Sequence, residues 1–211
     1  MLPIYSPGML SHRLIVVVSA MMTSTLLAAE QRSGSRRTTN EVKCAADLGA
    51  GVKTKRQFCD VVIASSGDGS VSMVIPPHTG TATLLFDLHN RFLVPLVTLD
   101  PSLAFTRHLA VVAVIGPTGG TIEQAAVMRE FRTTEDLFDS IGGGGRPGGI
   151  KAVAPSDPEA VRVTIPAGVN AVGIVGVRLD VTTRTTAKDS FDTPGRAIAI
   201  VSNLRIQYTA R

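Results

Sequence analysis

The residues whose types and spacing could do chemistry are an aspartate and a histidine two positions apart. Asp87 and His89 lie in an apolar segment, so on a strand both side chains project to the same face. Such a pair could move a proton or bind a metal ion, with His78 and His108 as further candidate ligands. Metal sites need three or four convergent ligands, and only two are close in sequence. We therefore predict the polar end of a strand, with no catalytic residue, metal or cofactor.

Other recognisable site motifs are missing from the sequence. It contains no GxSxG, HExxH, nucleotide-binding loop or dinucleotide fingerprint. The run at 142–149 (GGGGRPGG) lacks the Lys-Ser/Thr of a phosphate loop and predicts a flexible surface loop. The chain has no Trp and two Tyr, which disfavours a stacking platform for sugars. Scattered basic residues without interleaved aromatics disfavour nucleic acid binding.

The N-terminal segment has the pattern of an export signal. His12 and Arg13 precede an uncharged apolar run that ends at Ala28 and Ala29. We expect residues 1–29 to be a signal peptide that is removed, which predicts a periplasmic or extracellular protein. The run is shorter than the ~20 residues of a spanning helix, so no permanent membrane anchor is expected.

Two cysteines, Cys44 and Cys59, are the only ones in the chain. In an oxidising compartment an even count favours pairing, and only one bridge is available. Closing a loop of this size stabilises the folded state by about 3 kcal/mol. A two-thiol metal or redox site is the alternative, but the spacing is not CxxC.

The rest of the chain predicts an all-β fold. Residues 30–43 are polar and are expected to form a flexible N-terminal arm, followed by a single domain over 44–211. Short apolar runs separated by Gly, Pro, Asp and Ser are typical of an antiparallel β-sandwich, with a jelly roll or Greek key as the candidate topology. The expected strands cover 60–64, 71–75, 81–88, 92–99, 109–115, 161–165, 175–181 and 196–209.

Two segments after the central strand are harder to interpret. Residues 121–131 could open a helix through a capping box, but they follow a Gly-rich turn and we favour a returning strand. Residues 134–141 (TEDLFDSI) predict one short helix, because a Thr cap precedes two acidic residues and a Gly follows.

Alternation within the last strands predicts which side chains share a face. Val175 and Leu179 should lie on one face, as should Ile200 and Leu204. Residues 71–86 and 161–176 also echo one another, each with an alternating strand that ends in Ile-Pro before a second strand. Either two related hairpins of a double Greek key or chance similarity accounts for this echo.

These observations predict an exported, non-catalytic β-sandwich that acts as a binding or structural module on a protein or glycan surface. One alternative is a carbohydrate-active or other hydrolase on a jelly-roll scaffold, with Asp87 and His89 near its site. The other is a component of cell-envelope assembly or adhesion. Ligand, partner and oligomeric state do not follow from the sequence.

Overall fold

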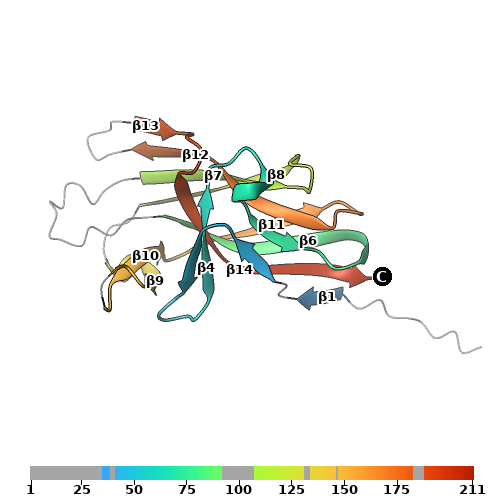
Figure 1. The fold of residues 1–211 in the computed structure, drawn as a ribbon, viewed down its shortest axis with the longest axis horizontal. Helices are drawn as coiled ribbons and strands as arrows, with labels where there is room; N and C mark the ends of the chain where they lie inside the picture. The colour runs from blue at the N-terminus through green and yellow to red at the C-terminus, as the bar shows by residue number, and fades with distance from the viewer. Residues whose placement is uncertain (1–34, 39–40, 92–106, 131–133, 146, 183–187) are drawn as a thin grey trace, which may run out of the picture. The chain divides into compact units, whose positions relative to one another are not determined.

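The computed structural model describes residues 35–38, 41–91, 107–130, 134–145, 147–182 and 188–211. They form two six-stranded antiparallel sheets and one separate hairpin (Figure 1), which confirms the predicted all-β sandwich. Sheet A contains β1 (Ser35–Thr38), β3 (Asp47–Ala50), β4 (Gln57–Val62), β6 (His78–Asn90), β11 (Glu159–Ile165) and β14 (Ala197–Ala210). Sheet B contains β2 (Val42–Cys44), β5 (Val71–Val74), β7 (Arg107–Ile115), β8 (Thr121–Glu130), β12 (Ala171–Thr182) and β13 (Lys188–Phe191). The hairpin is β9 (Leu137–Gly142) with β10 (Ile150–Pro155), and 3-10 turns occupy Gly67–Gly69 and Thr134–Asp136.

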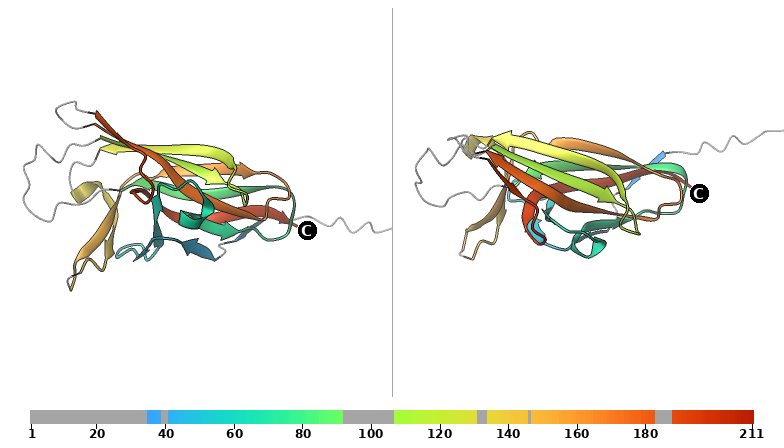
Figure 2. Two further views of the ribbon diagram at one scale, coloured as in Figure 1. Left: turned by 45° about the horizontal axis from the view of Figure 1, so that its top comes forward. Right: turned by 90° about the horizontal axis from the view of Figure 1, so that it is seen from above.

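Each sheet is built around one long strand. In sheet A the order is β11-β6-β14-β4-β3, and β1 pairs with the half of β14 that β4 leaves open. In sheet B the order is β2-β5-β12-β7-β8, and β13 pairs with the end of β12 beyond β5. Figure 2 shows these sheets as two stacked layers.

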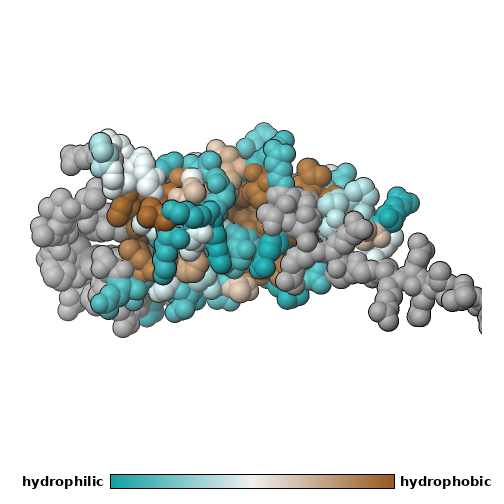
Figure 3. Space-filling model, turned by 90° about the horizontal axis from the view of Figure 1, so that it is seen from below, coloured by the Kyte–Doolittle hydropathy of each residue, from teal (hydrophilic) through white to brown (hydrophobic). Residues whose placement is uncertain are grey.

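The core between the sheets follows from alternation along the strands. Phe86 and Leu88 of β6 face inward with Val112 and Val114 of β7, and all four are buried. Their removal from water is the main stabilising contribution, at about 25 cal/mol per Å² of apolar surface. Outside the core, apolar side chains form smaller patches between hydrophilic ones on the face shown in Figure 3.

Two β-bulges overturn part of the predicted face assignment. The register shifts between Gly176 and Arg178, so Val175 packs on the outer face of sheet B whereas Leu179 lies in the core. A second shift follows Ser202 in β14, and it puts Ile200 and Leu204 in different clusters. A bulge adds one residue to one strand, so side chains beyond it change faces.

The two echoing segments occupy related places in the two sheets. They are not hairpins, because β5 and β6 lie in different sheets, as do β11 and β12. Instead β5 pairs with β12 in sheet B, while β6 pairs with β11 in sheet A. The buried residues Ile75 and Ile165 precede the two prolines at the crossing points. Each segment therefore bridges the sandwich, and the two pair with one another at both ends.

Opposite sides of the sandwich are closed by different contacts. On one side the predicted disulfide is present, and Cys44 of β2 joins Cys59 of β4 across the two sheets. Near the other side, the buried Asn90 side chain of β6 donates a hydrogen bond to the Val127 carbonyl of β8 at 3.1 Å. This bond satisfies a carbonyl at the edge strand β8 and connects sheet A with sheet B.

Of the two segments that were hard to interpret from the sequence, one agrees with the structure and one does not. The favoured returning strand over 121–131 is confirmed by β8, which pairs along β7. The short helix over 134–141 is wrong: a 3-10 turn covers Thr134–Asp136, and the strand β9 follows. Pairing with β10 and burial of Ile141 override the local capping signals.

The predicted N-terminal arm, residues 30–43, includes β1 and the start of β2. The signal peptide predicted for residues 1–29 and the strand predicted for 92–99 lie outside the described residues. In the part of the chain that is described, no helix has the length and apolar character needed to cross a membrane.

Candidate functional site

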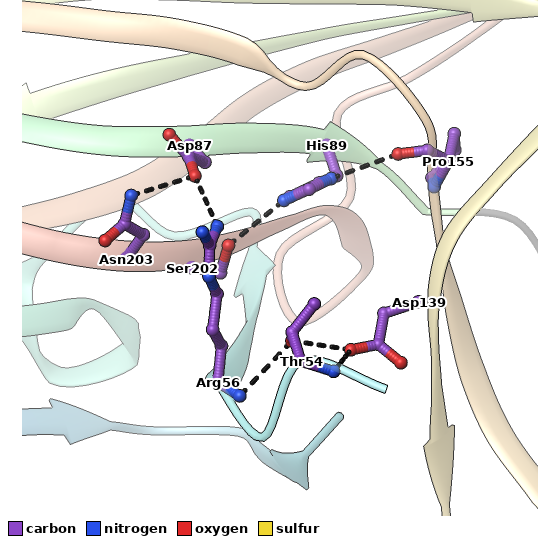
Figure 4. A network of polar contacts seen from close by, with 8 residues as sticks. All are labelled: Thr54, Arg56, Asp87, His89, Asp139, Pro155, Ser202 and Asn203. Atoms are coloured by element: carbon purple, nitrogen blue, oxygen red, sulfur yellow. Dashed lines mark hydrogen bonds and ion pairs between the residues drawn. The ribbon is translucent and has the colours of Figure 1, made fainter. Parts of the chain in front are cut away.

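Polar side chains gather where the β9–β10 hairpin covers the outer face of sheet A (Figure 4). Sheet A contributes Asp87 and His89 from β6, and Ser202 and Asn203 from β14. The turn between β3 and β4 contributes Arg56, just before β4 begins. We call these five residues the interlayer polar cluster. It contains the Asp87–His89 pair singled out in the sequence.

His89 connects sheet A with the β9–β10 hairpin. Its Nδ1 lies 3.3 Å from the Pro155 carbonyl of β10, and its Nε2 lies 3.1 Å from the Ser202 hydroxyl. A carbonyl only accepts, so Nδ1 carries the proton and Nε2 of the neutral ring accepts from Ser202. The ring lies between Phe58 and Phe138, at centroid distances of 5.8 and 5.4 Å.

Burial governs the charge of this histidine. His89 is 1% exposed, and removal from water lowers its pKa to about 4. The Pro155 carbonyl and the Asp87 carboxylate oppose this shift, whereas the Arg56 guanidinium adds to it. His89 is therefore neutral at pH 7, in agreement with its hydrogen bonds.

The Asp87 carboxylate does not bond to His89 but to two other side chains. Its Oδ2 accepts from Arg56 Nη1 at 3.0 Å and from Asn203 Nδ2 at 3.0 Å. Asn203 adopts φ +57° at the β14 bulge, a conformation that Asn tolerates better than most residues. The Arg56 side chain is 40% exposed, so this ion pair contributes modestly to stability.

A buried carboxylate, Asp139, fixes the hairpin to the β3–β4 turn. Asp139 of β9 accepts from the backbone N–H groups of Lys53 and Thr54 at 2.9 and 2.8 Å, and from the Thr54 hydroxyl at 2.6 Å. The Ser140 N–H is a fourth donor, at 2.8 Å. Burial alone would raise the pKa of Asp139, but these hydrogen bonds outweigh it and leave the pKa below its ordinary value.

A third carboxylate, Asp60 of β4, pairs with Arg91 at 2.6 Å. Burial raises the pKa of Asp60, and the hydrogen bond and charge of Arg91 oppose that effect. Arg91 lies just beyond the end of β6, so this pair links that end of β6 to β4 in the same sheet.

Ser202 and His89 have only some of the features of a catalytic serine and its general base. A hydroxyl donating to an imidazole is the first step of serine activation. The other ring nitrogen, however, meets the Pro155 carbonyl and not a carboxylate. Ser202 is 0% exposed, so no substrate reaches its hydroxyl in this structure. These contacts instead hold the β9–β10 hairpin against sheet A.

The other histidines singled out in the sequence lie elsewhere. His78 begins β6, while His89 stands near its far end, and His78 Nδ1 contacts the Pro76 carbonyl at 2.9 Å. His108 belongs to β7 of sheet B, and burial lowers its pKa to about 4. Within the described residues, no three His, Cys, Asp or Glu side chains are grouped so that they could hold a metal ion.

Sequence reasoning missed most partners of the cluster. The helix expected over 134–141 includes Asp139, Arg56 reads only as one of several scattered basic residues, and no pattern singles out Ser202 or Phe138. One signal was available for β14, because the polar pair Ser202-Asn203 interrupts an otherwise apolar run. Such a break marks a bulge or a buried polar contact.

Comparison with known proteins yields no relative for this architecture. No protein-family model, curated protein or solved structure matches the chain.

Proposed function

We propose that this chain is an exported, non-catalytic module that binds another protein through the outer face of sheet B. The sequence at 14–29 and the Cys44–Cys59 bridge support export, because disulfides persist in oxidising compartments. The contacts of the interlayer polar cluster support a non-catalytic role, since Ser202 and His89 are buried and bonded to one another.

The observation that carries the binding proposal is the distribution of exposed apolar side chains. Among the described residues, large apolar side chains are exposed at Val52, Val74, Met128, Ile150 and Val177. Three of these, Val74, Met128 and Val177, belong to strands of sheet B. Sheet B therefore contains most of the exposed large apolar side chains of the described residues, and exposed apolar surface is a frequent feature of interaction sites.

The surroundings of Met128 favour a protein partner over a glycan. A groove of about 360 Å³ lies beside it, with Leu109 and Val181 among its apolar lining residues and Asp180 and Lys188 among its charged ones. Apolar residues surrounded by charges of both signs are typical of protein interfaces. Sugars usually stack on aromatic rings, and none of the described residues that line this groove is aromatic.

Site-specific photo-crosslinking in the producing cells tests the binding proposal. A photoreactive amino acid is placed at Val74 or Met128, which are 64% and 49% exposed. Val52 is the matched control, because it is an apolar residue of similar exposure, 56%, outside sheet B. We expect one defined protein adduct from both sheet B positions and none from Val52. No adduct, or equal adducts from all three positions, would contradict the proposal.

Export is tested separately by the redox state of the two cysteines. The full chain should contain no free thiol in cells, whereas a variant lacking residues 1–29 should keep Cys44 and Cys59 reduced. Alkylation of free thiols followed by gel electrophoresis distinguishes the two states. A fully reduced full-length chain would refute export without bearing on the binding face.

The hydrolase alternative rests on the Ser202–His89 hydrogen bond of 3.1 Å. It requires a rearrangement that exposes the serine. Reaction with a fluorophosphonate probe, lost in Ser202→Ala, would establish it and displace the non-catalytic proposal.

A further inference from the structure

The β9–β10 hairpin is attached to the sandwich by few backbone contacts. It forms a sheet of its own. Among the described residues, one isolated β-bridge joins it to the sandwich, between Ile141 of β9 and Gly51, which follows β3. Within this bridge the Val52 N–H donates to the Ser140 carbonyl at 2.8 Å. The hairpin is therefore not a continuation of either sheet's ladder.

Side chains supply the remaining attachment. Asp139 accepts hydrogen bonds from the Lys53–Thr54 segment, and Lys151 Nζ donates to the Asp47 carbonyl at 2.9 Å. The apolar cluster under the hairpin has six buried members, against twenty-four in the main core. Regions with few buried apolar contacts open at lower free energy than the core they rest on.

His89 is the titratable group at the centre of this attachment. From the hairpin it faces Phe138 and the Pro155 carbonyl, and from β14 it faces Ser202. The charges that act on it are Asp87 on its own strand and Arg56 from the β3–β4 turn. The hairpin's own carboxylate, Asp139, is bonded to Lys53, Thr54 and Ser140 and not to His89.

We propose that the β9–β10 hairpin is an acid-sensitive cover, which detaches from sheet A as a unit while the two-sheet sandwich stays folded. A proton added to Nε2 turns the acceptor of the Ser202 hydroxyl into a second donor. It also places a positive charge in a dry site near the Arg56 guanidinium. Detachment lets water reach the charged ring, so acid favours the open state.

Linkage gives the size of the effect. The pKa of His89 is about 4 under the hairpin, and 6.5 is the ordinary value for an exposed ring. The open population should then rise roughly fortyfold between pH 6 and pH 4. Above pH 7 the ring is neutral in both states, and the opening equilibrium should not depend on its titration.

Hydrogen exchange of the intact protein tests this proposal, with rates corrected for the intrinsic effect of pH. Protection of amides in Leu137–Gly142 and Ile150–Pro155 should fall roughly fortyfold between pH 6 and pH 4, and at each pH these amides should be less protected than those of β12, because the hairpin opens while the sandwich stays folded. In His89→Gln, whose amide is neutral at every pH, the fall should disappear. His108→Gln is the matched control, because its pKa is also about 4 and it lies in sheet B, and it should keep the fall.

Three outcomes would overturn the proposal. They are a hairpin whose protection does not change with pH, a hairpin whose amides are protected to the same degree as those of β12 at every pH, and a His89→Gln variant that keeps the full effect. If His89→Gln does not fold, the first two outcomes in the unsubstituted protein still decide the matter. Asp139→Asn provides a positive control, since loss of its carboxylate should increase hairpin exchange at every pH.

Discussion

Cys44 and Cys59 lie in different sheets, and the bond between them is a covalent link across the sandwich. Their Cα atoms are 5.5 Å apart, and Cys59 is buried while Cys44 is partly exposed. The bridge stands on the side where the short strand β2 forms the edge of sheet B. It holds an edge that three residues of backbone pairing would hold only weakly.

Removal of this bridge should destabilise the protein without changing its fold. Replacing both cysteines with Ala should lower the free energy of unfolding by about 3 kcal/mol, because the open chain gains entropy. Urea unfolding followed by circular dichroism measures the difference. The unsubstituted protein in reductant should behave like the variant, and equal stability of the oxidised and substituted proteins would contradict the prediction.

Asp139→Asn should weaken the attachment of β9. Three of its four donors belong to Lys53 and Thr54, and a neutral amide cannot accept from all of them as a carboxylate does. We expect a loss of about 2 kcal/mol in the free energy of unfolding. Asp68→Asn, in an exposed turn, is the control and should change stability by less than about 0.5 kcal/mol. Equal effects of the two substitutions would show that the Asp139 contacts contribute nothing.

Gly176→Ala should destabilise the contact between the sheets. A Cβ at this position would lie 2.9 Å from the Ile63 amide nitrogen and 2.9 Å from Ile198 Cδ1. The backbone cannot give way as a flexible side chain does, so the cost should be about 2 kcal/mol. Gly67→Ala is the matched control, because a Cβ there meets no atom within 4 Å. Thermal unfolding of both variants measures the difference, and a neutral Gly176→Ala would refute the close approach.

His108 should make the sandwich less stable in acid. Burial lowers its pKa to about 4 from 6.5, so between these values the unfolded chain binds a proton that the folded protein does not. Stability is thus unaffected by this group above pH 6.5 and falls as the pH drops toward 4. The difference in unfolding free energy between His108→Gln and the unsubstituted protein should shift in favour of the variant over this interval. Chemical denaturation at pH 7, 6, 5 and 4 checks it, and a constant difference would contradict it.

Periodicity was sufficient to predict the sandwich because most strands bury one face. The alternation at Asp87 and His89 correctly puts both on the face opposite Phe86 and Leu88, which lie in the core. It could not show that His89 is buried as well, because the cover on that face comes from β9 and β10, some fifty or more residues along the chain. Burial by a distant segment leaves no mark on local alternation.

The wrong face assignments beyond the bulges and the wrong helix prediction have a different cause. Alternation assumes one residue per step, and the extra residue near Val177 reverses every face beyond it. At 134–141 the capping residues favour a helix locally. In the structure, however, Asp139 accepts a hydrogen bond from Thr54, and Ile141 is buried in an apolar cluster with residues of sheet A. Contacts between segments far apart in sequence decided both cases, and a single sequence does not list them.

The central place of β14 has a consequence for the order of events during synthesis. Both β4 and β6 pair with this strand, so sheet A has no continuous ladder until residues 197–210 have left the ribosome. The strands β4 and β6 must wait for β14, and the sequence distance between partners slows closure. The ribosome therefore holds the first strands of sheet A in a chain that still lacks the partner joining them.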